Sequence, residues 1–381
     1  MLDRLVRLFT SLKLTVVLLS LGLVLVFWGT MAQVHLGLYR AQNEFFRSFF
    51  IFWEPAGTSL KIPIFPGGYL VGGLLLINLL AAHTRYYQPG KWKIGLVMIH
   101  LGVVLLLVGQ LLTDVLSTES VMHLRNGETK NYSEADRSYE LAITDTTDAR
   151  ADKVFAIPGR RLAEGGDIAV PGLPFTVRVR KYLPNSTLAQ QPGPGLEEVK
   201  AATGIGSSVW WQALPHETAM DRRDMPSAIV ELATPQGSLG VFLVSTFIDR
   251  PQAVTVAGRH FELTLRPQRF YQPFSLHLVE FKHDKYPGTD IPKNFSSRVR
   301  LHNFKTGEDR EVLIYMNNPL RYGGETFYQA SFDPDDKGSI LQVVHNPSWL
   351  TPYFSCVLVG LGLMVQFTSH LFGHAAQRRN P

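Results

Sequence analysis

The chain has 381 residues, of which 45% are hydrophobic and only 18% are charged, and its formal net charge is +5. This length allows two or three domains, or a membrane part joined to a folded domain. The segment 113–349 carries 26 Lys and Arg against 29 Asp and Glu, so it is nearly neutral and nucleic acid is not expected as a partner. The excess positive charge flanks apolar segments, where membrane lipid accounts for it.

Four apolar runs without charged residues predict membrane-spanning helices. In chain order they are the segments 14–32, 67–82, 94–112 and 350–372. A helix needs about 20 apolar residues to cross the hydrocarbon core of a bilayer. The second run approaches that length only when it includes the Pro and Gly residues before it, and it contains Asn78. The first run has a longer apolar core than a secretory signal, so we expect an uncleaved anchor.

Lys and Arg near the helix ends predict the orientation in the membrane. They are frequent in the segments 1–13, 83–93 and 373–381, and sparse in the longer loop 33–66. We therefore expect a multi-pass protein of the inner (plasma) membrane with both termini in the cytoplasm and the segment 113–349 outside it. The aromatic part of the loop 33–66 predicts either a short helix lying in the membrane interface or an aromatic belt at a helix end.

After the third run the hydrophobic pattern changes to a period of two. Asn126-Gly127 between two alternating runs predicts a hairpin. The runs "FTVRVRKY", "HFELTLRP", "SLHLVEF", "RVRLHN" and "EVLIYMN" alternate in the same way. The segment 113–349 is therefore predicted to be an antiparallel β domain, either a sandwich or an open barrel, in a 3+1 arrangement of helices around it. The stretch 190–208 is rich in Pro, Gly and Ser and predicts a long loop or insertion.

Catalytic and redox motifs are missing from the sequence. The single cysteine, Cys356, lies in the last apolar run, and no C-x-x-C exists, so thiol exchange by this chain is excluded. There is no G-x-S-x-G, no P-loop and no H-E-x-x-H, and the scattered histidines make no zinc spacing. We therefore expect no catalysis by this chain alone.

One imidazole, His100, lies within the third apolar run. It follows Lys93 by seven residues, which places it about 10 Å into the helix. A polar side chain at that depth is costly and by default indicates function. Gly95, Gly102 and Gly109 recur every seven residues and predict a seam for close helix packing. His100 is about 200° from Gly102 around the helix axis, so we expect it to face a different neighbour or a pocket.

The residues alone leave two roles open for His100. A neutral imidazole can form a hydrogen bond across helices, for which Asn78 or Gln110 would be the partner. It can also be an axial ligand of haem iron, for which an apolar pocket is a suitable environment.

Three segments together resemble a known family. They are "LFTSLKLTVVLLSLGLVLVFWGT", "IHLGVVLLLVGQLLT" followed by "ESVMHLRNGETKNY", and "MNNPLRYGGETFYQASFDPDDKGSILQVVHNPSWLTPYFSCVLVGLG". With them the chain resembles the ResB family, also called CcsB, of System II cytochrome c biogenesis. The 3+1 helix arrangement with a large β domain also matches that family.

The resemblance implies a subunit that works with a CcsA or ResC partner to move haem b across the membrane. The haem is then attached to apocytochrome c, and a thiol-reducing protein acts in the same pathway. A histidine in an H-x-G setting of the third helix is implied to bind haem in transit, and His100 with Gly102 matches that setting. The tryptophan-rich segment of the partner is missing from this sequence, so the chain is expected to be the separate B component. A second imidazole on the iron would then come from a partner helix.

Two other functions fit the layout without haem chemistry. One is a membrane-anchored binding or sensor domain outside the cytoplasm. The other is a transporter permease, which the 3+1 order disfavours because permeases place a large external domain after the first helix.

Overall fold

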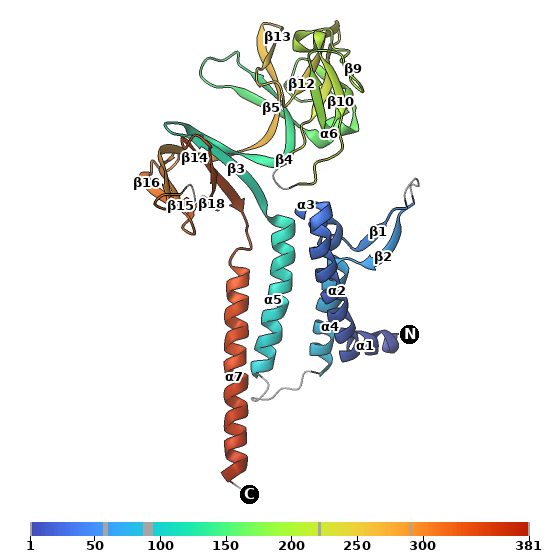
Figure 1. Cartoon of the computed structure of the whole chain (residues 1–381), viewed down its shortest axis with the longest axis vertical. Helices are drawn as coiled ribbons and strands as arrows, with labels where there is room; N and C mark the ends of the chain where they lie inside the picture. Colours follow the sequence, from blue (N-terminus) through green and yellow to red (C-terminus); the bar gives the residue numbers. More distant parts are fainter. Residues whose placement is uncertain (1, 56–59, 87–93, 220–221, 290–291, 380–381) are drawn as a thin grey trace. The chain divides into compact units, whose positions relative to one another are not determined.

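The structure is a computed structural model that describes residues 2–55, 60–86, 94–219, 222–289 and 292–379. It divides into a helical unit and a β unit (Figure 1). The helical unit comprises Met1–Thr118, Thr218–Met220 and Asn346–Pro381, and the β unit comprises Glu119–Glu217 and Asp221–His345. Most of the predicted cytoplasmic turn 83–93 lies outside the described residues.

The helical unit holds the apolar segments of the chain. Its elements are α1 (Leu2–Phe9), α2 (Leu12–Leu36), α3 (Leu38–Ala41), a π-helical turn (Gln42–Phe46), β1 (Phe50–Trp53), β2 (Ile62–Pro66), α4 (Gly68–Tyr86), α5 (Ile94–Leu116) and α7 (Thr351–Arg379). Within the described residues, α2, α5 and the part Thr351–Phe372 of α7 are long and apolar enough to cross a membrane. The chain is therefore a membrane protein, and α4 as a fourth span stays a prediction.

The polar interruption of α4 has a structural reason. Asn78 is 1% exposed. Its amide donates hydrogen bonds to the backbone oxygens of Phe9 (2.7 Å) and Ser11 (3.3 Å), and its side-chain oxygen accepts one from the Thr15 hydroxyl (2.6 Å). Asn78 thus closes the turn between α1 and α2, which explains a polar residue in an otherwise apolar run.

The aromatic loop differs from the predicted interfacial helix. Helical structure ends at Phe46, and the chain continues as the antiparallel hairpin β1–β2. Ile51 is buried with Phe65 against α2, whereas Phe50 and Phe52 are exposed. Ile51 is the buried residue of β1, and the backbone of β1 pairs with β2 instead of forming helical turns. The prediction of a helix beyond Phe46 is wrong for that reason.

The β unit confirms the predicted antiparallel β domain. Its elements are β3 (Thr118–Arg125), β4 (Thr129–Asp145), β5 (Lys153–Pro158), α6 (Gly159–Glu164), β6 (Gly166–Ala169), β7 (Thr176–Leu183), β8 (Ser186–Ala189), β9 (Glu197–Glu198), β10 (Trp210–Ala213), β11 (Ser227–Thr234), β12 (Gly237–Ser245), β13 (Gln252–Val256), β14 (Arg259–Lys285), β15 (Pro292–Asn303), β16 (Asp309–Tyr315), β17 (Leu320–Tyr322), β18 (Glu325–Phe332) and β19 (Gly338–His345). A turn with Gly127 at φ +82° joins β3 to β4, as the predicted hairpin requires.

The largest sheet is barrel-like. Its strand order is β16-β15-β14-β4-β3-β19-β18-β17, and β13 and β5 pair with β14 and β4 beside this path. A bridge between Tyr315 and Asn318 brings the two ends of the order together, so the sheet is nearly closed. The predicted strands "HFELTLRP" and "SLHLVEF" are both parts of the 27-residue β14, whose pairing with β4 is irregular between Tyr271 and Leu276.

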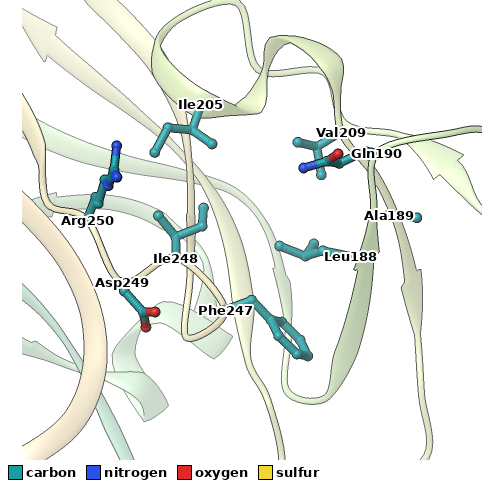
Figure 2. Close-up of a pocket in the computed structure, with 9 residues that line it drawn as sticks. All are labelled: Leu188, Ala189, Gln190, Ile205, Val209, Phe247, Ile248, Asp249 and Arg250. Atoms are coloured by element: carbon teal, nitrogen blue, oxygen red, sulfur yellow. The ribbon is translucent and has the colours of Figure 1, made fainter.

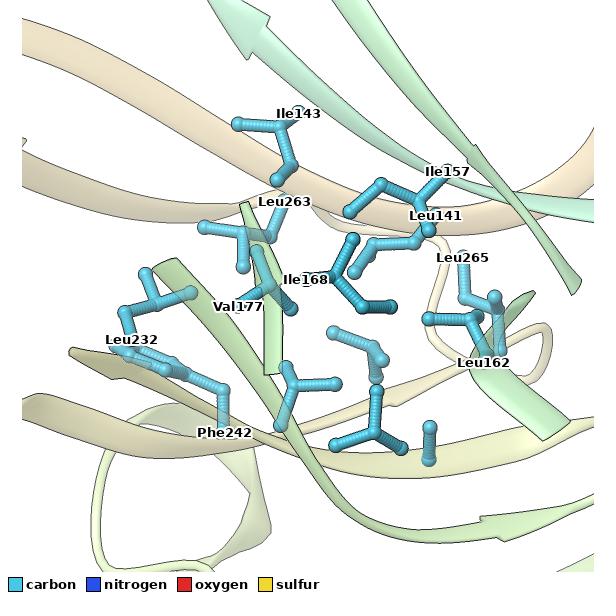
Figure 3. Packing of buried hydrophobic residues seen from close by; sticks show 14 of the residues in the cluster. Leu141, Ile143, Ile157, Leu162, Ile168, Val177, Leu232, Phe242, Leu263 and Leu265 are labelled. Atoms are coloured by element: carbon cyan, nitrogen blue, oxygen red, sulfur yellow. The ribbon is translucent and has the colours of Figure 1, made fainter. Parts of the chain in front are cut away.

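Two hydrophobic cores share the long strand β14, which pairs with β4. In the first core, Leu141 and Leu263 pack with residues of β5, β6, β7 and β11 (Figure 3). In the second core, Leu276 and Leu278 of the same strand β14 pack with residues of β15 and β19. The β unit is therefore two lobes built on one continuous pair of strands.

The stretch 190–208 is mostly irregular, as predicted, but it is folded onto the domain. It contains the short strand β9 and a 3₁₀ turn, Gly204–Ser208, and it lies between β8 and β10 of a three-stranded sheet. Val199 and Ala201 are buried in a third cluster around Trp211, which is 2% exposed. Val209 and Trp211 are thus part of one packing cluster.

An ion pair between the two long strands provides a stability test. Arg266 and Glu140 face each other across β14 and β4, with Nε to Oε1 at 3.1 Å and side-chain exposures of 13% and 7%. The variant Arg266→Met leaves a buried carboxylate without its partner, so we expect a loss of about 3 kcal/mol in the free energy of unfolding. Urea denaturation followed by tryptophan fluorescence measures it. The double variant Arg266→Met/Glu140→Leu should recover most of the loss, and an equal loss in both would contradict the explanation.

Asp145 at the end of β4 gives a pH test. Hydrogen bonds from the Thr147 hydroxyl and the Arg259 guanidinium lower the pKa of its carboxyl from 3.8 to about 2. Because the folded state stabilises the carboxylate, ionised Asp145 contributes to the free energy of unfolding above about pH 4. This contribution is lost as the pH falls toward about 2. We expect Asp145→Asn to remove this part of the acid sensitivity. Thermal unfolding midpoints between about pH 2 and 5 would show a smaller fall in the variant than in the wild type.

Candidate functional site

The glycine seam of α5 packs against α7, as the sequence predicts. Gly95, Gly102 and Gly109 are the buried residues of α5. A Cβ placed on Gly95 would lie 2.7 Å from the backbone nitrogen of Gln366 and from the backbone oxygen of Gly362. The close approach of the two backbones therefore requires residues without a side chain at these positions.

His100 faces away from that seam and toward α4. Its ring and the ring of His83 have centroids 5.7 Å apart at an interplanar angle of 80°. The two imidazoles are thus in edge-to-face contact. The sequence analysis expected His100 to face a neighbour other than the helix packed against the glycine seam. In the structure this neighbour is a second histidine, His83 of α4.

The pairing with His83 was missed because the sequence analysis considered only Asn78 and Gln110 as partners within the chain. One signal was available. Helices α4 and α5 are close in the sequence, and such neighbouring helices run antiparallel. His83 lies three residues before the end of α4 and His100 six residues after the start of α5, so their depths are expected to differ by about one helical turn.

The Nδ1 atom of His100 is buried and has no hydrogen-bond partner among the described residues. Asn78, one of the two partners considered for it, is engaged with α1 and α2. Gln110, the other one, has an exposed side chain. A buried polar atom without a partner requires an explanation, such as a ligand or a functional role.

A polar cluster holds the opposite end of the same helices. Asp114 of α5 accepts from Nε of Arg47 (2.7 Å) and from the Tyr69 hydroxyl at the start of α4. Its side chain is only 11% exposed. This cluster fixes α4 against α5 at one end, while the two histidines meet near the other end.

The chemistry of this site is that of imidazole in apolar surroundings. The part of the chain that the structure describes holds no group of three or more His, Cys, Asp or Glu side chains suited to a metal ion. His370 of α7 has its Nε2 2.8 Å from Nε2 of Gln366. Imidazole is an axial ligand of haem iron in many proteins, so His100 is a candidate to bind haem.

Fold and site define a class, a helical membrane protein that carries an antiparallel β domain. The sequence model of the ResB-like family matches residues 237–340, which extend from β12 into β19. This match confirms the resemblance given above for that part of the chain, which is similar to the ResB-like family.

Two known proteins are similar to this chain. Protein NrfI of Wolinella succinogenes is 27% identical over 300 residues, which are 77% of this chain and 29% of that protein. The cytochrome c biogenesis protein CcsB of Prochlorococcus marinus is 34% identical over 83 residues, which are 20% of this chain and 19% of that protein. The matched part of the chain thus spans less than a third of either relative.

The glycine seam generates a stability prediction. Gly95→Ala puts a methyl group against backbone atoms of α7 that cannot move aside. We therefore expect the free energy of unfolding to fall by about 1 to 3 kcal/mol. Gly73→Ala in α4 is the matched control, since no heavy atom lies within 4 Å of its added Cβ. Thermal unfolding of the detergent-solubilised protein compares the two. Equal midpoints for both variants would mean that α5 and α7 are not packed as described.

Proposed function

We propose that this chain is a subunit of a membrane complex that conveys haem across the membrane and supports its attachment to apocytochrome c. The observation that carries the proposal is the buried, unpartnered Nδ1 of His100 within an apolar helix. It is supported by the ResB-like match and by the cytochrome c biogenesis name of one relative.

In this proposal His100 is an axial ligand of haem b in transit. Its surroundings are apolar, which suits a porphyrin, and it lies on the face of α5 away from α7. The second axial ligand is assigned to a helix of a CcsA/ResC-type partner. His83, whose ring centroid lies 5.7 Å from that of His100, is assigned to ring packing instead.

The remaining parts of the chain have separate roles in this scheme. Both termini lie in the cytoplasm, the protein is in the inner membrane, and the β domain lies outside the cytoplasm. There the β domain meets apocytochrome c, whose cysteines a thiol-reducing protein of the pathway keeps reduced. The near-neutral charge of the segment 113–349 argues against a purely electrostatic grip on either partner.

The test is the haem content of the complex purified with its partner. We expect His100→Ala to lower the haem absorbance at least about fivefold and to abolish holocytochrome c in cells, because an axial ligand is lost. His370→Ala is the matched control, a histidine near the end of α7 that contacts Gln366 instead. Added imidazole should restore part of the signal in His100→Ala, which it would not do for a packing defect.

His83→Ala separates ligation from ring packing. If the partner supplies the second ligand, this variant retains haem with a changed spectrum, whereas a loss equal to that of His100→Ala assigns the second ligand to His83. Full haem retention and normal holocytochrome c in His100→Ala would contradict the site. Normal cytochrome c in a strain that lacks this chain would instead favour the binding or sensor domain.

A further inference from the structure

The irregular stretch 190–208 builds one wall of a pocket in the β unit. The cavity has a volume of about 420 Å³ and lies among three segments, 188–190, the turn with Ile205 and Val209, and 247–250. Figure 2 shows the side chains of Leu188, Ile205, Val209 and Ile248 arranged around one space. A volume of this size is within the range of binding pockets for small ligands and single large side chains.

The pocket is apolar at its base and open at its rim. Leu188, Val209 and Ile248 pack against the buried cluster around Trp211, so the base continues the domain core. Ile205 and Phe247 at the rim are 45% and 46% exposed. Exposed apolar side chains around a concave apolar base are typical of interaction sites.

The outer edge of the short strand β8 lies beside the same pocket. β8 is the outer strand of the order β8-β10-β9. The backbone N–H of Ser186 donates to the oxygen of Met225, so it points away from β10. Because backbone groups alternate sides along a strand, the N–H and C=O of Leu188 point the same way. Among the described residues, no backbone hydrogen bond is formed by Leu188 on that side.

The chemistry of the lining excludes haem as the occupant. Within the described residues the lining has no His, Cys, Met or Tyr, and thus no axial ligand for iron. Asp249 and Arg250 contribute one charge of each sign, so the pocket does not select an anion or a cation. Unpaired backbone groups at a strand edge beside an apolar pocket are instead the arrangement that binds an extended peptide by strand addition.

We propose that this pocket binds an extended segment of unfolded apocytochrome c, which adds to the edge of β8 and places one large apolar side chain in the cavity. The inference rests on the proposed function, because that function supplies an unfolded client. A client without its haem has no completed core, so its backbone groups are free to pair with Leu188. Strand addition would hold such a segment extended with little dependence on its sequence.

Binding is tested with the full-length protein in lipid nanodiscs. The probe is a fluorescent peptide of about 20 residues from the haem-attachment region of an apocytochrome c, with both cysteines replaced by serine. We expect a micromolar Kd by fluorescence anisotropy and a weakening of at least about tenfold for Ile205→Arg, because an apolar contact at the rim becomes a charge. Leu214→Arg is the matched control, an exposed leucine of the same unit outside the pocket lining, and should change the Kd less than about twofold.

A backbone-methylated series of the same peptide tests the binding mode. Each N-methyl group removes one donor, and only alternate residues of an added strand face β8. We therefore expect weakening at every second position along the bound segment. Uniform small effects would overturn strand addition.

Two outcomes overturn the proposal as a whole. One is an unchanged Kd in Ile205→Arg with an unchanged unfolding midpoint. The other is concentration-dependent dimerisation of the wild type that Ile205→Arg abolishes, which would assign the pocket to a second copy of this chain. Neither outcome affects haem retention at His100, so failure here is distinct from failure of the proposed function.

Discussion

The close packing of α5 on α7 is the constraint on which the candidate site depends. Glycines at three successive heptad positions let the two backbones approach until an added Cβ at Gly95 would meet backbone atoms. With one face of α5 occupied in this way, His100 must lie on the other face, where α4 provides His83. The glycines of α5, which have no side chain, thus determine where the polar ring of His100 lies.

The β unit contains two hydrophobic cores that are joined by long strands. Strands β4 and β14 are long enough to contribute Leu141 and Leu263 to one core and Leu276 to the other. A buried ion pair, Arg266 with Glu140, crosses the two strands before the pairing becomes irregular. Unfolding of one lobe therefore disturbs the strands that support the other.

Local patterns predicted much of this architecture. Apolar runs located the helices, the period of two located the strands, and the heptad of glycines located the seam on α5, because each feature depends on residues close in sequence. The hairpin β1–β2 was missed, since the aromatic run around Phe50 contains both helical and strand spacings and only contact with α2 selects between them. The pocket beside Leu188 joins distant segments, which one sequence without its tertiary fold does not bring together. The His83–His100 contact, by contrast, could have been inferred from the short distance in sequence between α4 and α5.

The seven-residue spacing of the glycines also limits how the helical unit can move. Sliding α5 along α7 by less than a full repeat would bring bulky side chains into the seam, and one repeat is about 10 Å at 1.5 Å per residue. Small sliding movements of α5 along α7 are therefore disfavoured, and we expect the two helices to move together. Any opening that admits a large flat molecule beside His100 has to come from α4 or from a neighbouring protein.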